Sequence, residues 1–377
     1  RTFIKKSSIT AASFLSSEAL IAAAWSKRVQ SLEKPDPVKI AILGLGGYAT
    51  NWIAPAIQQA EYAKLTGIIS GSPQKYPIWQ EKYQIPDANV YSYDDLEQIA
   101  NNPEIDCVYV VTPPGNHAEF TIKCLNAGKH VICEKPMARS EDECSLMIQT
   151  AKSVKKSLQL GYRLYWDPHT VKFIHSMRDM EFGAWKTFKT AFSSRPNDSN
   201  FQRKKWRIER AMSLGGGLGE LGVYCVQSAF YLVQNYPTLV EAKSWTKRTN
   251  IFKEVPEHWE WELTWPDGRK SQHNSGWGKY SHFIHMETRD GAMELEPAYS
   301  YSGNKGYTPQ GQLTLQNIFQ QKLQINSQCL TIRNRRPNIT SGEMGRRDVK
   351  IITAIMKSAA SNKAVTLTKA GTAATRA

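Results

Sequence analysis

A short, mostly apolar segment that leads straight into a glycine-rich turn constrains this chain more than any other feature. Residues Val38 to Leu43 are rich in β-formers, and the next six residues, Gly44-Leu45-Gly46-Gly47-Tyr48-Ala49, match the pattern G-x-G-x-x-A. In a strand–turn–helix unit, the first glycine permits the tight turn, the second lets the backbone approach a pyrophosphate, and the small final residue lets the helix pack closely. The segment predicts a dinucleotide-binding unit whose cofactor-binding residues are Gly44, Gly46, Gly47, Tyr48 and Ala49.

Further strand signals follow this turn at regular intervals. They lie at Leu65 to Ser70, Ile105 to Val111, His130 to Glu134 and Leu158 to Gly161, with helical stretches between them. This alternation is typical of a doubly wound parallel sheet. A length of 377 residues is enough for two domains, so we expect residues 38–163 to form a Rossmann domain and a second domain to follow.

The end of the second strand indicates the preferred cofactor, because an acidic side chain there binds the ribose 2′-hydroxyl of NAD. This chain has no acid at that position; the strand leads into Ser70-Gly71-Ser72-Pro73-Gln74-Lys75. Hydroxyl groups and the cation of Lys75 would suit a 2′-phosphate, which favours NADP and makes NAD the less favoured cofactor. The alternative is that Lys75 is a solvated lysine and that Ser70 and Ser72 only shape a turn.

The formal net charge of +14 raises the possibility of a polyanionic partner. Nucleic-acid binders concentrate basic residues on one face or in runs. The densest cluster here surrounds Trp206 and consists of Arg203, Lys204, Lys205, Arg207 and Arg210. We interpret this cluster as a solvated loop and expect no nucleic-acid partner.

The six cysteines predict neither a disulfide framework nor a metal site. They form no C-x-x-C pair, and no histidine has the spacing of a tetrahedral metal site. Cys107 and Cys133 lie in apolar, strand-like segments, where a free cysteine packs as a small hydrophobic residue. We therefore expect buried thiols.

The first residues resemble a twin-arginine export signal. Arg1-Thr2-Phe3-Ile4-Lys5-Lys6 precedes a small, apolar stretch that ends in Ala22-Ala23-Ala24, which resembles a cleavage site. The stretch is too short and too polar to span a bilayer, so we expect no stable membrane anchoring. Residues 1–25 are thus expected to direct export to the periplasm, and residues 26–37 to form a linker or arm. The alternatives are an amphipathic N-terminal helix and a cytoplasmic location.

Two later turns resemble those of a known family. They are the T-P-x-x-x-H turn at 112–117 and the E-K-P turn at 134–136, and both follow predicted strands, where open α/β sheets bind their ligands. Together they resemble the glucose–fructose oxidoreductase family of nicotinamide-dependent sugar enzymes. The similarity continues at Ser70-Gly71, Gly161-Tyr162-Arg163, Trp206-Arg207, Gly215-Gly216-Gly217, Gly222-Val223-Tyr224, Gly342-Glu343 and Asp348. The resemblance implies further cofactor-binding residues at Ser70, Gly71, Lys75, Thr112, Pro113, Asn116, His117, Glu134, Lys135 and Arg163, with His117 as a turn residue and not a base.

The resemblance also implies a second α/β domain with a large, mostly antiparallel open sheet that covers the nicotinamide and serves in subunit contacts. Alternating residues at Trp185 to Phe192, Trp259 to Trp265 and His282 to Glu287 independently indicate strands. We expect a substrate and oligomerisation domain at 164–345, and a C-terminal helix and tail at 346–377 that pack back on the first domain. An exposed sheet needs covering, which favours a homodimer or homotetramer.

Hydride transfer from a sugar carbinol requires a base that accepts the hydroxyl proton. Related dehydrogenases resemble one another in an acid-x-x-x-His or acid-x-x-x-Tyr pair, which here is Glu220 and Tyr224, on one face of a helix. Tyr224 is the candidate acid/base, unless it only packs, and Lys135 is its electrostatic partner, because a cation favours a phenolate. Glu220, where the family commonly has Asp, is expected to bind a sugar hydroxyl. Arg163 and Tyr162 are expected to bind substrate in the same pocket, although a structural ion pair would also explain Arg163.

The resemblance implies an enzyme that transfers hydride between an aldose or ketose and a tightly bound NADP. An aldose is oxidised to its lactone and a ketose is then reduced at one site, and an internally recycled cofactor suits an exported protein. Three alternatives stay open: a sugar dehydrogenase or reductase that exchanges its cofactor, an exported NAD-dependent glycoside hydrolase, and a non-catalytic sugar-binding protein. Retention of the dinucleotide through gel filtration would separate the first of these from the main hypothesis.

Overall fold

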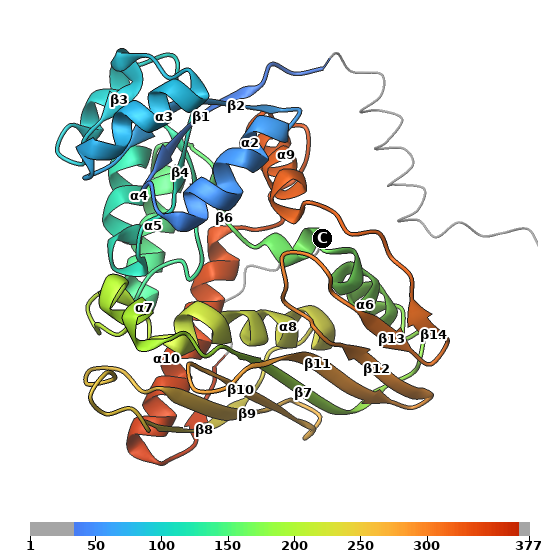
Figure 1. Cartoon of the computed structure of the whole chain (residues 1–377). Helices are drawn as coiled ribbons and strands as arrows, with labels where there is room; N and C mark the ends of the chain where they lie inside the picture. Colours follow the sequence, from blue (N-terminus) through green and yellow to red (C-terminus); the bar gives the residue numbers. More distant parts are fainter. Residues whose placement is uncertain (1–33, 369–377) are drawn as a thin grey trace, which may run out of the picture. The chain divides into compact units, whose positions relative to one another are not determined.

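Parallel strands form the first sheet, as the strand signals predict (Figure 1). The computed structural model describes residues 34–368, and within them this sheet has six strands in the order β3-β2-β1-β4-β5-β6. Their bounds are β1 (Val38–Leu43), β2 (Ala63–Ile69), β3 (Val90–Tyr91), β4 (Cys107–Val110), β5 (His130–Cys133) and β6 (Leu158–Leu160). The order reverses at β1, so the glycine turn and the end of β4 meet at the switch point where such sheets bind ligands.

Helices cover both faces of this sheet, as a buried parallel sheet requires. Successive residues of β1 alternate between two cores: Ile40 and Ile42 face one, and Ala41 and Leu43 face the other. The helices of this half are α2 (Ala54–Gln59), α3 (Tyr76–Tyr83), α4 (His117–Asn126) and α5 (Glu141–Ser153). A later helix, α9 (Gln320–Ile332), packs beside α2 on the first sheet, although it lies in the range expected for the substrate domain.

The second sheet is mostly antiparallel, which confirms the predicted α/β fold. In the described region it has nine strands, ordered β14-β13-β12-β11-β7-β10-β9-β8-β15, and only β7 and β10 pair in parallel. The strands are β7 (Trp185–Ser193), β8 (Leu239–Trp245), β9 (His258–Thr264), β10 (Lys270–Gly276), β11 (Ser281–Thr288), β12 (Gly291–Leu295), β13 (Gly306–Thr308), β14 (Gly311–Leu313) and β15 (Val365–Thr366). Gly268 and Gly291 have positive φ in the hairpin turns that join β9 to β10 and β11 to β12.

The remaining helices lie mainly between the second sheet and the first half of the chain (Figure 1). They are α6 (Pro168–Arg178), α7 (Asp198–Arg203), α8 (Val223–Val233) and α10 (Gly342–Ser361). Nearly every residue of α8 is buried. α10 contacts both α5 and β8, and the segment after it adds β15 to the edge of β8. The C-terminal segment therefore packs on both halves, whereas we had expected it to pack back on the first alone.

The cysteines are free and buried, and burial raises the pKa of all six thiols. Between residues 34 and 368, no helix is both long and apolar enough to cross a membrane, and no cluster of His, Cys, Asp or Glu is placed to hold a metal ion. The export signal expected at 1–25 and most of the linker expected at 26–37 lie outside the described residues.

Asp167 connects the start of α6 with two later segments of the chain through hydrogen bonds. Its Oδ2 caps α6 by accepting hydrogen bonds from the amide of Thr170 at 2.8 Å and from its hydroxyl at 2.9 Å. Its Oδ1 accepts hydrogen bonds from Asn304 at 2.9 Å and from Gln320 of α9 at 3.0 Å. The residue is buried, so no water replaces these partners if the carboxylate is removed.

We expect Asp167→Ala to lower the free energy of unfolding by about 2 kcal/mol, because it removes a helix cap and takes the shorter of two hydrogen bonds from each of two buried amides, which keep only their longer bonds to the Ser300 carbonyl oxygen. Urea denaturation measures the change. Asp179→Ala, at the exposed opposite end of α6, is the matched control and should change stability by less than about 0.5 kcal/mol. Equal effects of the two substitutions would contradict this account.

Candidate active site

The glycine turn after β1 exposes its backbone to a cavity. Gly44 has φ +99°, and a Cβ there would lie 2.8 Å from the carbonyl oxygen of Val111, which excludes a side chain. A Cβ on Gly46 or Gly47 would meet nothing within 4 Å, and both residues line the cavity. Ala49 is fully buried in the helical turn Ala49–Ile53 that follows. The turn therefore leaves room for a phosphate group against the backbone.

His117 connects the two motif turns. Its ring places Nε2 2.7 Å from the carbonyl oxygen of Thr112 and Nδ1 2.9 Å from that of Pro136. Burial lowers the pKa of His117, which favours the neutral ring. This arrangement suits a residue that holds the turns together and not a catalytic base. Asn116 lies in the same turn and lines neither of the cavities described here.

Glu134 is buried at the end of β5, where a neighbouring glycine makes room for its carboxylate. Tyr109 donates a hydrogen bond to Glu134 Oε1 at 2.9 Å, and the amide of Lys135 donates to Oε2 at 3.2 Å. A Cβ on Gly161 would overlap Oε1, so only glycine fits there. Burial raises the pKa of Glu134. The carboxylate is thus fixed beside the cavity that Lys135 also lines.

Lys135, Glu220 and Tyr224 meet in the folded chain. Lys135 Nζ donates a hydrogen bond to the backbone carbonyl oxygen of Glu220 at 2.8 Å and lies 4.6 Å from the centre of the Tyr224 ring. Glu220 lies in the helical turn Leu218–Gly222, and Tyr224 lies in the first turn of α8, which follows directly. Both side chains line the same cavity, so the predicted acid, tyrosine and lysine are brought together.

An ion pair that we had not identified holds the Glu220 carboxylate. Arg207 Nη2 donates to Glu220 Oε1 at 2.5 Å, and the two side chains are only 14% and 18% exposed. The basic cluster at 203–210 is therefore not simply a solvated loop: Lys204, Trp206 and Arg207 line the cavity. The Glu220 carboxylate neutralises the Arg207 guanidinium, which lines the cavity. The Trp206-Arg207 motif was the sequence signal for this ion pair.

Arg163 is buried beneath the site and is largely occupied by protein partners. Its guanidinium donates hydrogen bonds to the carbonyl oxygens of Tyr299 at 2.5 Å and Ser300 at 3.1 Å, and to Gln320 Oε1 at 2.5 Å. Its centre lies 5.0 Å from the centre of the Tyr224 ring. These partners are neutral oxygens and not a carboxylate, so they form no ion pair with Arg163. Arg163 also lines a cavity together with Tyr224, and its Nε is buried there without a hydrogen-bond partner.

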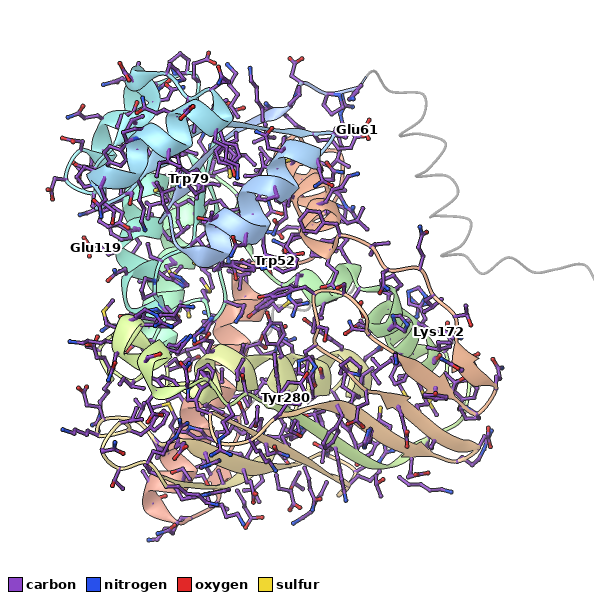
Figure 2. All side chains as sticks on the ribbon, viewed as in Figure 1. Trp52, Glu61, Trp79, Glu119, Lys172 and Tyr280 are labelled. Carbon is purple, nitrogen blue, oxygen red and sulfur yellow. The ribbon has the colours of Figure 1, made fainter. Side chains whose placement is uncertain are left out.

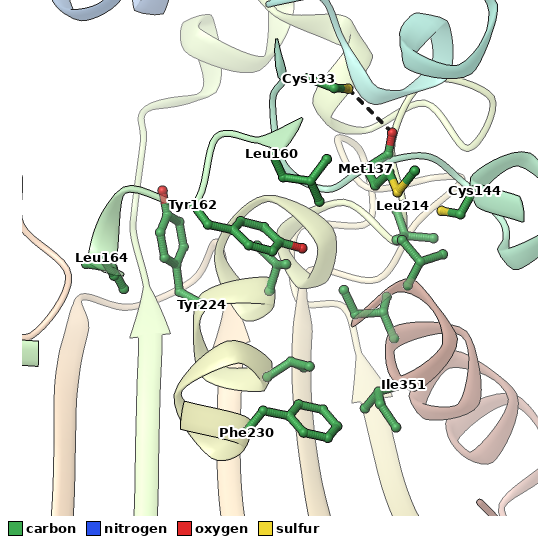
Figure 3. Packing of buried hydrophobic residues seen from close by; sticks show 14 of the residues in the cluster. Cys133, Met137, Cys144, Leu160, Tyr162, Leu164, Leu214, Tyr224, Phe230 and Ile351 are labelled. Atoms are coloured by element: carbon green, nitrogen blue, oxygen red, sulfur yellow. Dashed lines mark hydrogen bonds between the residues drawn. The ribbon is translucent and has the colours of Figure 1, made fainter. Parts of the chain in front are cut away.

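Tyr162 lies in the core and not at the site, which corrects the expectation that it binds substrate. It is 1% exposed and lines neither cavity. Figure 3 shows the hydroxyl groups of Tyr162 and Tyr224 pointing in different directions. Tyr162 precedes the helical turn Arg163–Trp166 that follows β6.

The residues expected at a 2′-phosphate lie at the end of β2. Ser70 is buried, and its Oγ accepts a hydrogen bond from the amide of Ser72 at 3.2 Å, while Gly71 is exposed. Lys75 Nζ donates to the carbonyl oxygen of Leu45 at 2.8 Å. The cation therefore lies between the end of β2 and the glycine turn, as a 2′-phosphate contact requires.

Two cavities share one wall. The first, of about 500 Å³, extends from the glycine turn along the 112–114 and 134–136 turns to residues 204–216. The second, of about 450 Å³, extends toward the second sheet and is lined by residues that include Phe192, His282 and Tyr299. The shared wall consists of Trp52, Lys135, Glu220, Tyr224 and Tyr301.

Trp52 and Tyr301 belong to this wall, and we had not identified either residue from the sequence. Their rings stack with centroids 4.2 Å apart. Figure 2 shows Trp52 where the first half of the chain approaches the second. No motif marks these aromatic residues, because an isolated aromatic side chain is equally common in a hydrophobic core.

The first cavity fits a nicotinamide dinucleotide. The open backbone at Gly46 and Gly47 suits a pyrophosphate. Thr112 Oγ1, Arg207 Nε and Glu220 Oε2 are buried without a hydrogen-bond partner. Such atoms cost free energy unless a bound molecule satisfies them. Of the residues expected to hold the dinucleotide, Gly46, Gly47, Tyr48, Thr112, Pro113, Glu134 and Lys135 line this cavity, whereas Ser70, Gly71 and Lys75 lie outside its lining.

The fold and the chain's sequence match known proteins along most of their length. A solved structure of aldose-aldose oxidoreductase from Caulobacter crescentus, complexed with glycerol, is similar with a TM-score of 0.84 and 33% identity, covering 88% of this chain and 100% of that chain. Levoglucosan dehydrogenase in complex with NADH and levoglucosan shares the fold, with a TM-score of 0.77, 17% identity and coverage of 89% and 100%.

Curated relatives match over shorter stretches. The scyllo-inositol 2-dehydrogenase (NADP(+)) of Bacillus subtilis is 29% identical over 220 residues, which is 58% of this chain and 57% of the relative. The D-xylose 1-dehydrogenase (NADP(+)) of Haloarcula marismortui is 22% identical over 268 residues, 70% of this chain and 73% of the relative. The chain thus spans little more than half the length of the first of these relatives.

Family profiles match both halves of the chain. The profile described as an oxidoreductase family with an NAD-binding Rossmann fold matches residues 38–162, and the profile of the GFO/IDH/MocA C-terminal domain matches residues 172–301. Together they span well over half of the chain, in the same order as its two sheets. The chain therefore belongs to the GFO/IDH/MocA family of oxidoreductases.

Proposed function

We propose that this protein is a sugar oxidoreductase that transfers hydride between an aldose or ketose and a tightly bound NADP. The observation that carries this proposal is the shared wall of the two cavities, which contains Lys135 and Tyr224. The first cavity begins at the glycine turn, where the dinucleotide belongs. The second gives a small polyol access to the same two side chains.

The second cavity suits a ligand with several hydroxyl groups. Three of its lining residues have a buried polar atom without a hydrogen-bond partner, namely Arg163 Nε, Glu220 Oε2 and His282 Nδ1. Phe192 and Tyr299 add apolar surface beside these atoms. A mostly apolar cavity with a few convergent polar groups is typical of a small-molecule site, and hydroxyl groups can both donate and accept.

Tyr224 is placed to move the proton of the reaction. The dinucleotide, when bound, accepts a hydride, and thus two electrons, from the carbinol carbon. The O–H bond breaks as the C=O bond forms, and Tyr224 Oη, acting as a phenolate, would take the proton; the reverse reaction would return both. Lys135 Nζ and the Arg163 guanidinium lie 4.6 Å and 5.0 Å from the centre of the Tyr224 ring, so two positive charges lie beside this group.

Three features support NADP and its retention. Lys75 stands at the end of β2, where no acid is present to select the unphosphorylated ribose. The inositol and xylose dehydrogenases described above carry NADP(+) in their names. The aldose-aldose oxidoreductase is similar along its whole length, and its name implies that one sugar is oxidised while another is reduced.

Purified protein should release NADP or NADPH on denaturation, at close to one molecule per chain. It should also convert mixtures of an aldose and a second aldose or ketose without added dinucleotide, as chromatography of the products would show. Protein that loses its dinucleotide on gel filtration, and turns over sugars only when NADP is added, would instead be a dehydrogenase with an exchangeable cofactor.

We expect Tyr224→Phe to lower kcat at least about 100-fold, because a general acid/base contributes a factor of this size. The dinucleotide content of the purified protein should stay the same. The matched control is Tyr231→Phe, two turns later on α8, whose hydroxyl donates to Gln227 and lines neither cavity. Near-normal turnover of Tyr224→Phe would show that another group moves the proton.

We expect Lys75→Ala to raise the Kd for NADP about tenfold, the effect of losing one charge-assisted hydrogen bond of about 1.4 kcal/mol. The Kd for NAD should change little, since NAD has no 2′-phosphate. Titration calorimetry of protein stripped of its dinucleotide measures both constants. Lys64→Ala, at an exposed position near the opposite end of β2, is the control. An unchanged preference in Lys75→Ala would remove this support for NADP.

A further inference from the structure

His282 lies on β11 at the wall of the second cavity, away from the motif turns. It is 7% exposed, and three aromatic rings hold its imidazole. The Phe192 ring meets it edge-on with centroids 4.4 Å apart, the Tyr299 ring does so at 5.7 Å, and the Tyr280 ring stacks at 5.8 Å. The ring is therefore held in one orientation before any ligand binds.

The imidazole of His282 has the chemistry of a hydroxyl-binding group. Burial, with a smaller effect of Arg163, lowers the pKa of His282 to about 4, so the ring is neutral near pH 7. A neutral imidazole offers one N–H donor and one acceptor nitrogen, which matches a hydroxyl group. Its Nδ1 is buried without a hydrogen-bond partner in the described part of the chain.

A second buried histidine in the same sheet shows what a purely structural role looks like. His273 on β10 has both ring nitrogens within 2.8 Å of a hydroxyl oxygen, one from Thr190 and one from Ser271. His273 lines a different cavity, where both of its ring nitrogens are already paired, whereas His282 lines the second cavity with an unpaired nitrogen. The nitrogen of His282 that lacks a hydrogen-bond partner therefore belongs to a side chain that lines a cavity large enough for a ligand.

His282 lies close to the reacting groups but not in contact with them. The Phe192 ring packs against both Tyr224, with centroids 5.4 Å apart, and His282 at 4.4 Å. The Tyr299 ring also contacts both, so two aromatic rings pack against the candidate proton carrier and the histidine. A hydroxyl group bound at His282 would belong to a sugar carbon other than the one that exchanges hydride.

From this geometry we infer that His282 is a substrate-binding residue that hydrogen-bonds a sugar hydroxyl remote from the reacting carbon. The inference rests on the proposed sugar oxidoreductase function and adds a determinant of which sugar is accepted. It assigns no proton transfer to His282. Its effect is therefore expected in substrate affinity and selectivity, and not in the chemical step.

Steady-state kinetics of the full chain with its bound dinucleotide test this inference. The probes are D-glucose, D-xylose and glucose analogues that each lack one hydroxyl. We expect His282→Phe, which keeps a ring but cannot form hydrogen bonds, to raise KM for the accepted sugar about tenfold with kcat within about threefold. For the analogue that lacks the partner hydroxyl, wild type and variant should have the same KM.

Two further variants separate a lost hydrogen bond from a disturbed fold. His282→Asn keeps a donor and an acceptor and should bring KM back to within about threefold of wild type. His285→Phe, on the same strand at an exposed position, should leave KM unchanged. The dinucleotide content of each purified variant reports whether its first cavity is intact.

The outcomes distinguish the two proposals. If His282→Phe lowers kcat/KM equally for glucose and every analogue, or if His282→Asn does not recover affinity, the role of His282 is overturned while the sugar function stands. If the wild-type protein carries dinucleotide but oxidises or reduces none of the sugars, the proposed function is wrong, and the inference about His282 is overturned with it.

Discussion

The hydrogen bond from Lys135 Nζ to the carbonyl oxygen of Glu220 joins the two halves of the site, and the other features of the site depend on it. Lys135 comes from the end of a strand in the first sheet, and Glu220 from the turn that leads into α8. The bond fixes the ammonium group beside the Tyr224 ring. Both residues of this bond belong to the wall that the cavity at the glycine turn shares with the cavity at the second sheet.

Most charged side chains around this contact have a hydrogen-bond or ion-pair partner within the protein. Arg207 neutralises the Glu220 carboxylate, and Arg163 is held by carbonyl and amide oxygens beneath Tyr224. Burying so many charged groups is unfavourable unless each has partners. Among residues 34–368, five polar atoms that remain unpaired belong to residues at the two cavities, where a bound dinucleotide or sugar would satisfy them: Thr112 Oγ1, Arg163 Nε, Arg207 Nε, Glu220 Oε2 and His282 Nδ1. Part of the +14 charge thus belongs to the site and not to a solvated surface.

Local patterns predicted the first sheet well, because each strand and its turn are encoded in a few neighbouring residues. The strand before Gly44 and the strand before the E-K-P turn are of this kind. The pairing of β15 with β8, and the position of α9 on the first sheet, were not predictable in this way. The first depends on which strand edge, and the second on which apolar sheet face, remains uncovered after the rest of the chain has folded.

The sequence by itself determined the glycine turn, because its geometry follows from backbone freedom over a few residues, and the resemblance to a family identified the E-K-P turn and the Glu220–Tyr224 pair, whose spacing places both side chains on one helical face. Only the tertiary structure decided that Trp52, Tyr301, Arg207 and His282 join them, and that Tyr162 does not. These side chains come from distant segments and carry no local pattern. Their place at the site depends on how the two sheets pack through α8, and no short stretch of residues encodes that packing.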